Sequence, residues 1–163
     1  MNNYCQQCKQ NVTWMPLTEA NAEDSSIAAG HYYLDFAEGT AAWKAKEITG
    51  KVCIDLNGYT IKTTKGRIYY TKGDTQLTIT DCTGNGVITG ADNSALMTEN
   101  KVESKPVINV FAGIFTGNTT PALGGAILCQ GSATLNVYGG TFENNTSVGR
   151  LKLDENGEPL LDE

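Results

Sequence analysis

Asp55 and Asp81 are the two carboxylates whose positions best suit chemistry on a sugar polymer. Each one follows a short segment in which apolar and polar residues alternate. Hydrolysis of a glycosidic bond uses a pair of carboxylates, and cleavage by elimination combines carboxylates that hold Ca²⁺ with a basic residue that takes a proton. Lys51, Lys62 and Lys72 are the basic residues nearby in the chain. Because Asp55 precedes Leu-Asn-Gly and Asp81 ends its segment, the sequence favours turn formation over catalysis for both.

Cys5 and Cys8 form a Cys-x-x-Cys motif, which supplies half of a zinc site or a redox pair. The residues that follow do not open a helix after a strand, so a thioredoxin-like redox site is disfavoured. A complete zinc site needs two more ligands. The available candidates are Cys53, Cys82, Cys129 and His31. A lone histidine in an apolar strand such as Gly30-His31-Tyr32-Tyr33-Leu34 is more typical of a packed residue than of a ligand.

Four tyrosines occur in two tandem pairs, Tyr32-Tyr33 and Tyr69-Tyr70. Side chains of a strand alternate between its two faces, so each pair directs one ring outward. Flat aromatic rings stack on the apolar faces of sugars, while nearby hydroxyl and amide groups fix their orientation. We therefore predict ligand-binding residues among these four tyrosines, the alternative being that the outward ring packs under a loop.

The composition excludes several classes of partner. Lys and Arg number 12 against 18 Asp and Glu, which gives a net charge of −6. Arginine occurs only at Arg67 and Arg150, with no basic cluster, so we expect neither nucleic acid nor an anionic membrane surface as a partner. No apolar run reaches the roughly 18 residues of a membrane span, and the N-terminus lacks the pattern of a signal peptide. No glycine-rich stretch matches a phosphate-binding loop, and we expect no cofactor.

Short alternating segments indicate an all-β fold. They are bounded by Gly, Asn or Asp, which supply the positive φ angles of tight turns, and the chain holds 18 Gly against 4 Pro. Ala, Lys and Glu between residues 38 and 48 predict one short helix.

Residues 109–120 and 136–147 repeat one another at an offset of 27 residues, with identity at 6 of the 12 positions. Strand starts near Val52, Leu77, Val107 and Thr134 are spaced by similar intervals. A period of this length indicates a β-solenoid, in which each repeat forms one coil and stacked coils bury a shared core. A β-sandwich with two similar hairpins is the alternative, but it does not require matching turns at a fixed offset.

The solenoid hypothesis predicts which side chains lie over one another. Phe115 should stack on Phe142 at one strand spacing of about 4.8 Å, and Asn118 should form an amide ladder with Asn145. The inward-facing positions are predicted to be Val52, Ile54, Leu56, Leu77, Ile79, Ile108, Val110, Leu135 and Val137. Cys53 and Cys82 alternate with these positions on successive coils, so a disulfide between them is predicted if the domain is extracellular.

Residues 124–147, together with Gly30-His31-Tyr32-Tyr33-Leu34 and residues 51–61 and 77–81, resemble the right-handed parallel β-helix repeats of secreted and cell-surface proteins from gut Firmicutes. The resemblance implies a pectate-lyase-like solenoid of about four coils. Residues 1–30 would then form an N-terminal cap, residues 31–147 the parallel β-helix, and residues 148–163 a C-terminal tail or cap. In such proteins a cysteine pair like Cys5 and Cys8 precedes a similar Val-Thr-Trp, which suggests a structural disulfide or metal clip.

The resemblance indicates architecture more than activity, because one fold supports many functions. We expect a non-catalytic extracellular module of a bacterial surface or secreted protein, serving in adhesion, in glycan binding or as a rigid spacer. Its partner would be a polysaccharide or a cell-surface glycoprotein, and an open solenoid end would permit self-association. The alternative is a fragment of a carbohydrate-active lyase or hydrolase.

Overall fold

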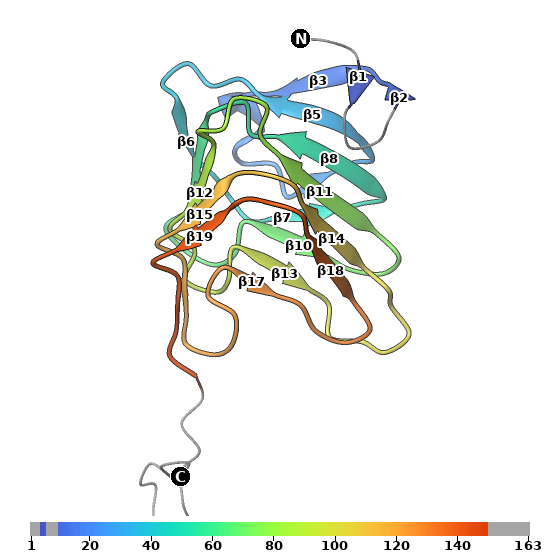
Figure 1. The fold of residues 1–163 in the computed structure, drawn as a ribbon, viewed down its shortest axis with the longest axis vertical. Helices are drawn as coiled ribbons and strands as arrows, with labels where there is room; N and C mark the ends of the chain where they lie inside the picture. Colours follow the sequence, from blue (N-terminus) through green and yellow to red (C-terminus); the bar gives the residue numbers. More distant parts are fainter. Residues whose placement is uncertain (1–3, 6–9, 150–163) are drawn as a thin grey trace, which may run out of the picture.

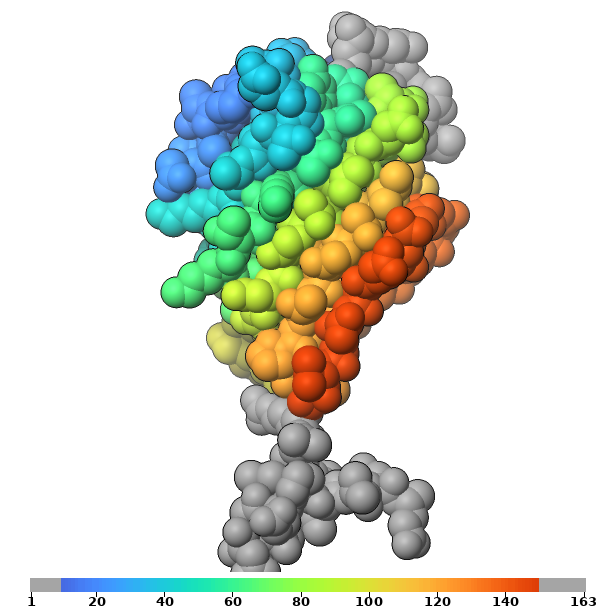
Figure 2. All heavy atoms as spheres, turned by 90° about the vertical axis from the view of Figure 1, so that its left-hand side faces the viewer, coloured from blue at the N-terminus to red at the C-terminus, as the bar shows by residue number. Residues whose placement is uncertain are grey.

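The computed structural model describes residues 4–5 and 10–149 of the chain. These residues form a parallel β-solenoid of about four coils, as the repeats predict. The coils follow one another from β3 at one end of the molecule to β17, β18 and β19 at the other (Figure 1). In the space-filling view they run as parallel diagonal bands in sequence order (Figure 2).

Three parallel sheets form the walls of the solenoid, and each full coil contributes one strand to each wall. Sheet 1 contains β3 (Trp14–Leu17), β5 (Gly30–Leu34), β8 (Lys51–Asp55), β11 (Gln76–Thr80), β14 (Val107–Val110) and β18 (Thr134–Val137). Sheet 2 contains β6 (Thr40–Ala42), β9 (Thr60–Lys62), β12 (Val87–Thr89), β15 (Ile114–Thr116) and β19 (Thr141–Glu143). Sheet 3 contains β4 (Ser26–Ile27), β7 (Lys46–Ile48), β10 (Tyr69–Thr71), β13 (Leu96–Thr98) and β17 (Ile127–Leu128).

The remaining elements are short. β1 (Tyr4–Cys5) pairs antiparallel with β2 (Gln10–Asn11), and β16 (Thr119–Thr120) pairs in parallel with β20 (Thr146–Ser147). A single turn of 3₁₀ helix, η1 (Glu19–Asn21), lies between β3 and β4. The segment predicted as a cap thus contributes a strand to sheet 1 and another to sheet 3. Residues 150–163, most of the predicted C-terminal tail, lie outside the described residues.

The predicted register of the coils is confirmed. Leu77 pairs with Val52 on one side and with Ile108 on the other, and Ile108 pairs in turn with Leu135. These residues therefore occupy one inward column, in which Val52, Leu77 and Ile108 are buried. Leu135 lies on the last coil and is 37% exposed, because no described coil covers it.

The last coil leaves apolar side chains open. Val137 and Phe142 occupy the same kind of inward position as their buried predecessors, yet they are 51% and 41% exposed. Together with Leu135 and residues 126–127 they line a hollow of about 360 Å³. Self-association through this end stays a prediction.

The two predicted stacks are present. The rings of Phe115 and Phe142 lie parallel with centroids 4.8 Å apart, which is the spacing of neighbouring strands. The amide of Asn118 is fully buried and bonds both neighbouring coils. Its Nδ2 donates to the Asn145 side chain at 2.9 Å and to the Ile88 carbonyl at 3.0 Å, while its Oδ1 accepts from the Ala91 N–H at 3.2 Å.

The predicted helix between residues 38 and 48 is wrong. This segment forms β6, a short connection and β7, because Ala41, Trp43 and Ile48 are all buried in the core, the first two at a spacing of two residues. Lys46 is also buried, which an exposed helix face would not require. Its ammonium group donates to the carbonyls of Asn21, Ala22 and Asp24 at 2.7–2.9 Å and lies 4.2 Å from the centroid of the Trp43 ring.

The Asn118→Ala variant tests the inter-coil ladder. It would leave the buried Ala91 N–H without its partner and would remove the side-chain bonds to the Ile88 carbonyl and to Asn145, which costs about 2–4 kcal/mol in the free energy of unfolding. Urea denaturation of the two proteins measures the difference. The matched control is Asn136→Ala, because the half-buried Asn136 makes a single side-chain bond, to Asn109 at 2.9 Å, and should cost under about 1 kcal/mol. Equal losses in the two variants would contradict a special role for Asn118.

Candidate functional site

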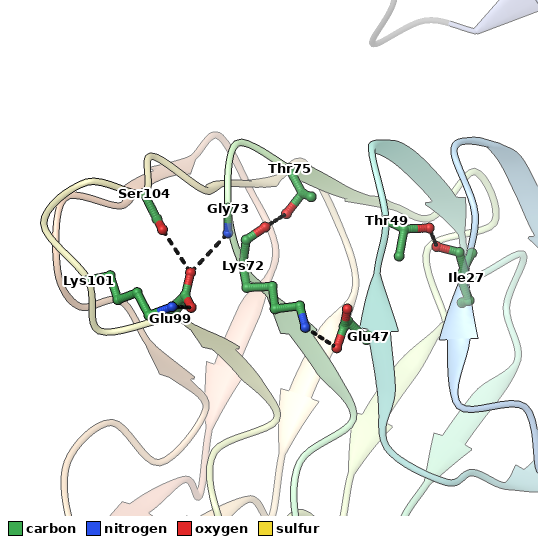
Figure 3. Close-up of polar contacts among 9 residues, drawn as sticks. All are labelled: Ile27, Glu47, Thr49, Lys72, Gly73, Thr75, Glu99, Lys101 and Ser104. Atoms are coloured by element: carbon green, nitrogen blue, oxygen red, sulfur yellow. Dashed lines mark hydrogen bonds and ion pairs between the residues drawn. The ribbon is translucent and has the colours of Figure 1, made fainter.

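A hollow lined by two lysines and two glutamates lies at the corner where sheet 3 passes into sheet 1. It has a volume of about 480 Å³ and is here named the corner groove. Three successive turns, one from each of three neighbouring coils, form its wall (Figure 3). The lining residues are Glu47, Ile48, Thr49, Gly50, Lys72, Gly73, Thr75, Glu99, Lys101 and Ser104.

Glu47 and Lys72 form the first ion pair of the corner groove. The Lys72 Nζ lies 2.8 Å from the Glu47 Oε2, and about half of the lysine side chain is exposed. The hydrogen bond to Glu47 and the charge of Glu47 raise the pKa of Lys72, with smaller contributions from Glu99 and Tyr70. Lys72 therefore stays cationic throughout the physiological range, with part of its surface open to a ligand.

Glu99 is the most highly coordinated side chain of the groove. Lys101 Nζ lies 2.8 Å from one carboxylate oxygen, and the other accepts from the Gly73 N–H at 3.0 Å and from the Ser104 hydroxyl at 2.8 Å. These partners, led by Lys101, lower the pKa of Glu99 to about 2. Since Gly73 and Ser104 come from different coils, the carboxylate links two turns and holds them in place (Figure 3).

Tyr70 borders the corner groove on the outer face of sheet 3. It is the register partner of Glu47 on β7 and of Met97 on β13, and it is half-buried. The guanidinium of Arg67 lies 4.7 Å from the centroid of its ring. This contact orients the ring beside the two ion pairs, so the site combines an aromatic surface with paired cations and carboxylates.

The other predicted tyrosines do not join this site. Tyr69 is fully buried, and burial raises its pKa above the ordinary range, so it offers no ring to a ligand. Tyr32 packs against the core and its hydroxyl donates to the Ala28 carbonyl at 3.1 Å. Tyr33 is half-buried on the outer face of sheet 1, beside Asp55 in register. Each tandem pair thus directs one ring outward, as predicted, but the two outward rings lie on different sheets.

The chemistry available to the corner groove is recognition of a polar ligand. The lysine ammonium groups are hydrogen-bond donors, the carboxylates are acceptors, and the Tyr70 ring supplies an apolar surface. Both carboxylates are paired with lysines, which makes them poor general acids or bases. Sugars carry hydroxyl groups around an apolar ring face and match this combination.

The sequence pointed to Lys72 only as a basic residue near Asp55 and Asp81, and it did not single out Glu47, Glu99 or Lys101. Lys72 and Glu99 occupy the same position in successive coils and are separated by 27 residues, the same interval as the strongest repeat. Charges that recur at the repeat period directly after a strand were the signal that could have located this surface.

Asp55 and Asp81 are turn residues, as their sequence context favours. The Asp55 Oδ1 accepts from the Asn57 N–H at 2.9 Å and from the Cys82 N–H on the next coil at 3.0 Å. The Asp81 carboxylate accepts from the Gly58 N–H at 2.9 Å and from the Gly86 N–H at 2.6 Å. Both side chains are buried, so neither presents a carboxylate to a polymer in solvent.

The cysteines lie in different surroundings. No disulfide joins Cys53 and Cys82. Cys53 is buried in the middle of β8 and pairs in register with Thr78 on β11, whereas Cys82 is exposed and follows Thr78 by four residues. At about 3.3 Å per residue this offset places the two thiols well beyond disulfide distance. Cys129 is half-buried, and burial raises the pKa of its thiol. Cys8 lies outside the described residues, and of Cys5 only the backbone is described.

The depressed pKa of Glu99 predicts a pH dependence of the groove. Because the pKa falls from an ordinary 4.5 to about 2 in the folded protein, the network contributes its full stability above pH 4.5 and loses it as the pH falls towards 2. Carbon NMR of the glutamate carboxyl groups should give a midpoint for Glu99 near 2. Lys101→Met should raise that midpoint, whereas Lys44→Met, which alters a lysine outside the groove, should not. A wild-type midpoint near 4.5 would contradict the network.

Comparisons with known proteins add no functional assignment: no protein-family model, curated protein or solved structure matches the chain. None of the described segments forms a helix with the length and hydrophobicity of a membrane span.

Proposed function

We propose that this chain is a non-catalytic module that binds glycan through the corner groove and the adjoining Tyr70 ring. The ligand would be a polysaccharide or the glycan of a cell-surface glycoprotein. A role outside the cell, on a bacterial surface or in a secreted protein, is part of the same proposal and rests on the sequence resemblance.

One observation supports the proposal more than any other: an outward tyrosine lies beside two lysine–carboxylate pairs. Tyr70 is the register partner of Glu47 on the adjacent strand, and it precedes Lys72 by two residues. The Glu99 network holds the turns on both sides of the groove. A site with its side chains held in advance loses less conformational entropy when a ligand binds.

Catalysis on a polysaccharide is the rival function, and the surroundings of the carboxylates disfavour it. A hydrolase needs two carboxylates that reach the glycosidic bond from opposite sides. Asp55 and Asp81 are buried and bonded to backbone N–H groups, and Glu47 and Glu99 are bonded to lysines. We therefore propose binding without cleavage.

Affinity electrophoresis tests the proposal. The purified chain is run in native gels that each contain one soluble polysaccharide, such as xylan, polygalacturonate, galactomannan or mucin. We expect retardation in at least one gel. Tyr70→Ala should weaken that binding at least tenfold, or about 1.4 kcal/mol, because the stacking surface is lost. Tyr70→Phe keeps the ring and should retain most of the affinity.

The control variant is Tyr138→Ala, which removes an exposed tyrosine from the last coil, away from the groove. It should bind as the wild type does. Equal retardation of wild type and Tyr70→Ala would place the glycan elsewhere on the surface. Clearing of the substrate would contradict the non-catalytic proposal, and no retardation in any gel would favour a spacer.

A further inference from the structure

A hollow of about 360 Å³, here named the lysine hollow, lies at the corner where sheet 2 passes into sheet 3. The connections that follow β6 and β9 on two neighbouring coils line it, and they contribute Lys44, Lys62 and Lys65. The sequence shows no basic cluster here, because Lys44 precedes the other two lysines by 18 and 21 residues. Stacking of the coils brings them together, since Ala42 on β6 is the register partner of Lys62 on β9.

The three lysines of the lysine hollow are exposed to solvent. None of their ammonium groups forms an ion pair or a hydrogen bond with another described residue. The two lysines of the corner groove differ from them, because each is bonded to a glutamate. Glu23 is the one carboxylate among the described residues of the lining, so three cations leave an excess of two positive charges. In a chain with a net charge of −6, this surface is a local attractor for anions.

Hydrogen bonds hold the backbone that carries these lysines. The Trp43 N–H donates to the Lys62 carbonyl at 2.8 Å and so joins the two coils, and Lys44 follows Trp43 directly. The Thr63 hydroxyl donates to the Lys65 carbonyl at 3.0 Å and accepts from the Lys65 N–H at 3.3 Å. The positions of the three lysines along the backbone are therefore fixed before a ligand binds, which lowers the entropic cost of binding.

Lys46 adds a fourth positive charge close to the hollow. Its ammonium lies 4.2 Å from the centroid of the Trp43 ring, and Trp43 belongs to the lining. Burial is the main cause that lowers the pKa of Lys46 to about 8, and the charge of Lys44 acts in the same direction. Because its ammonium is bound to three carbonyls, Lys46 contributes charge to the hollow without contacting a ligand.

We propose that the lysine hollow binds the anionic groups of an acidic polysaccharide, either the carboxylates of uronic acids or sulfate esters. Lysine ammonium groups supply the countercharge, and the exposed Thr64 in the lining adds a hydroxyl that can bond a sugar hydroxyl. The site shares no residue with the corner groove, which lies at the other end of the sheet 3 strands.

Single-stranded nucleic acid is a less suitable ligand for this surface. Its binding uses a long basic groove together with aromatic rings on which the bases stack. The aromatic residue of the lining, Trp43, is only 3% exposed. The positive surface also ends at the next coil, where the carboxylate of Asp92 accepts from the Gly66 N–H. Three exposed lysines on two coils suit a few charged groups on a sugar chain better than a continuous phosphate backbone.

Fluorescence anisotropy of labelled polymers, titrated with the full chain at low salt, tests the site. Dextran sulfate and dextran share one sugar backbone and differ in the sulfate groups, while polygalacturonate presents carboxylates. Binding of either acidic polymer, without binding of dextran, supports the proposal. The affinity should fall as salt is added, because exposed charges are screened.

The double variant Lys62→Gln/Lys65→Gln should weaken binding of the acidic polymer at least about tenfold, because two charge-assisted contacts are lost. Lys44→Gln should weaken it as well, since this lysine reaches the hollow from the neighbouring coil. The matched control is Lys51→Gln/Lys105→Gln, which removes the same charge from two exposed lysines outside both hollows and should change the affinity less than about twofold. Circular dichroism confirms that each variant is folded.

Four results would overturn the proposal. Neither acidic polymer binds; or dextran binds as well as dextran sulfate does; or the two double variants lose equal affinity, as a general charge effect would produce; or labelled single-stranded DNA binds more tightly than both acidic polymers. The two proposed sites can fail separately, because Tyr70→Ala tests the corner groove and Lys62→Gln/Lys65→Gln tests the lysine hollow.

Discussion

Each coil must place its side chains directly over those of the coil before it, about 4.8 Å away, because the backbone hydrogen bonds of a solenoid link successive coils. This spacing suits side chains that can pack against a copy of themselves. Phe115 and Phe142 pack at this spacing with parallel rings, and Asn118 and Asn145 form a hydrogen bond between their side-chain amides. The sheets, the core and the corner groove follow from this repeat, since residues about one period apart become neighbours.

The corners impose a second requirement, because the chain leaves the sheets there and its N–H and carbonyl groups lose their ladder partners. Buried polar side chains replace those partners, often from the next coil. Asp55 reaches the Cys82 N–H, Asp81 reaches the Gly58 N–H, and the Lys46 ammonium binds carbonyls around η1. Carboxylates that resemble catalytic residues in the sequence therefore hold turns together.

The repeat made much of the fold predictable from sequence. Identical residues at a fixed offset indicated which side chains would stack, and the strand starts followed from the same alignment. The helix prediction between residues 38 and 48 failed because composition was weighed above position: Ala41 and Trp43 are spaced as on a strand, and the ammonium of Lys46 is satisfied by carbonyls of a segment more than 20 residues away.

Prediction of the candidate sites was less complete. Alternation alone correctly implied that one ring of each tyrosine pair faces outward, but it did not reveal which ring has charged neighbours. Lys72 meets Glu47, and Gly73 meets Glu99, across turns about one period apart in sequence. Likewise, the meeting of Lys44 and Lys62 at one hollow depends on the register of β6 and β9, which the repeat did not define at this end of the chain.

The matching of β14 and β15 with β18 and β19 bears on how such a protein changes length in evolution. Each residue of the earlier pair of strands lies under its counterpart 27 positions later, so the boundary between these coils resembles a boundary between identical units. After duplication or loss of one such unit, the neighbouring coils would still pack against side chains of the same types as before. Genes for this architecture can therefore lengthen or shorten the molecule in steps of one strand spacing, about 4.8 Å, without redesign of the core.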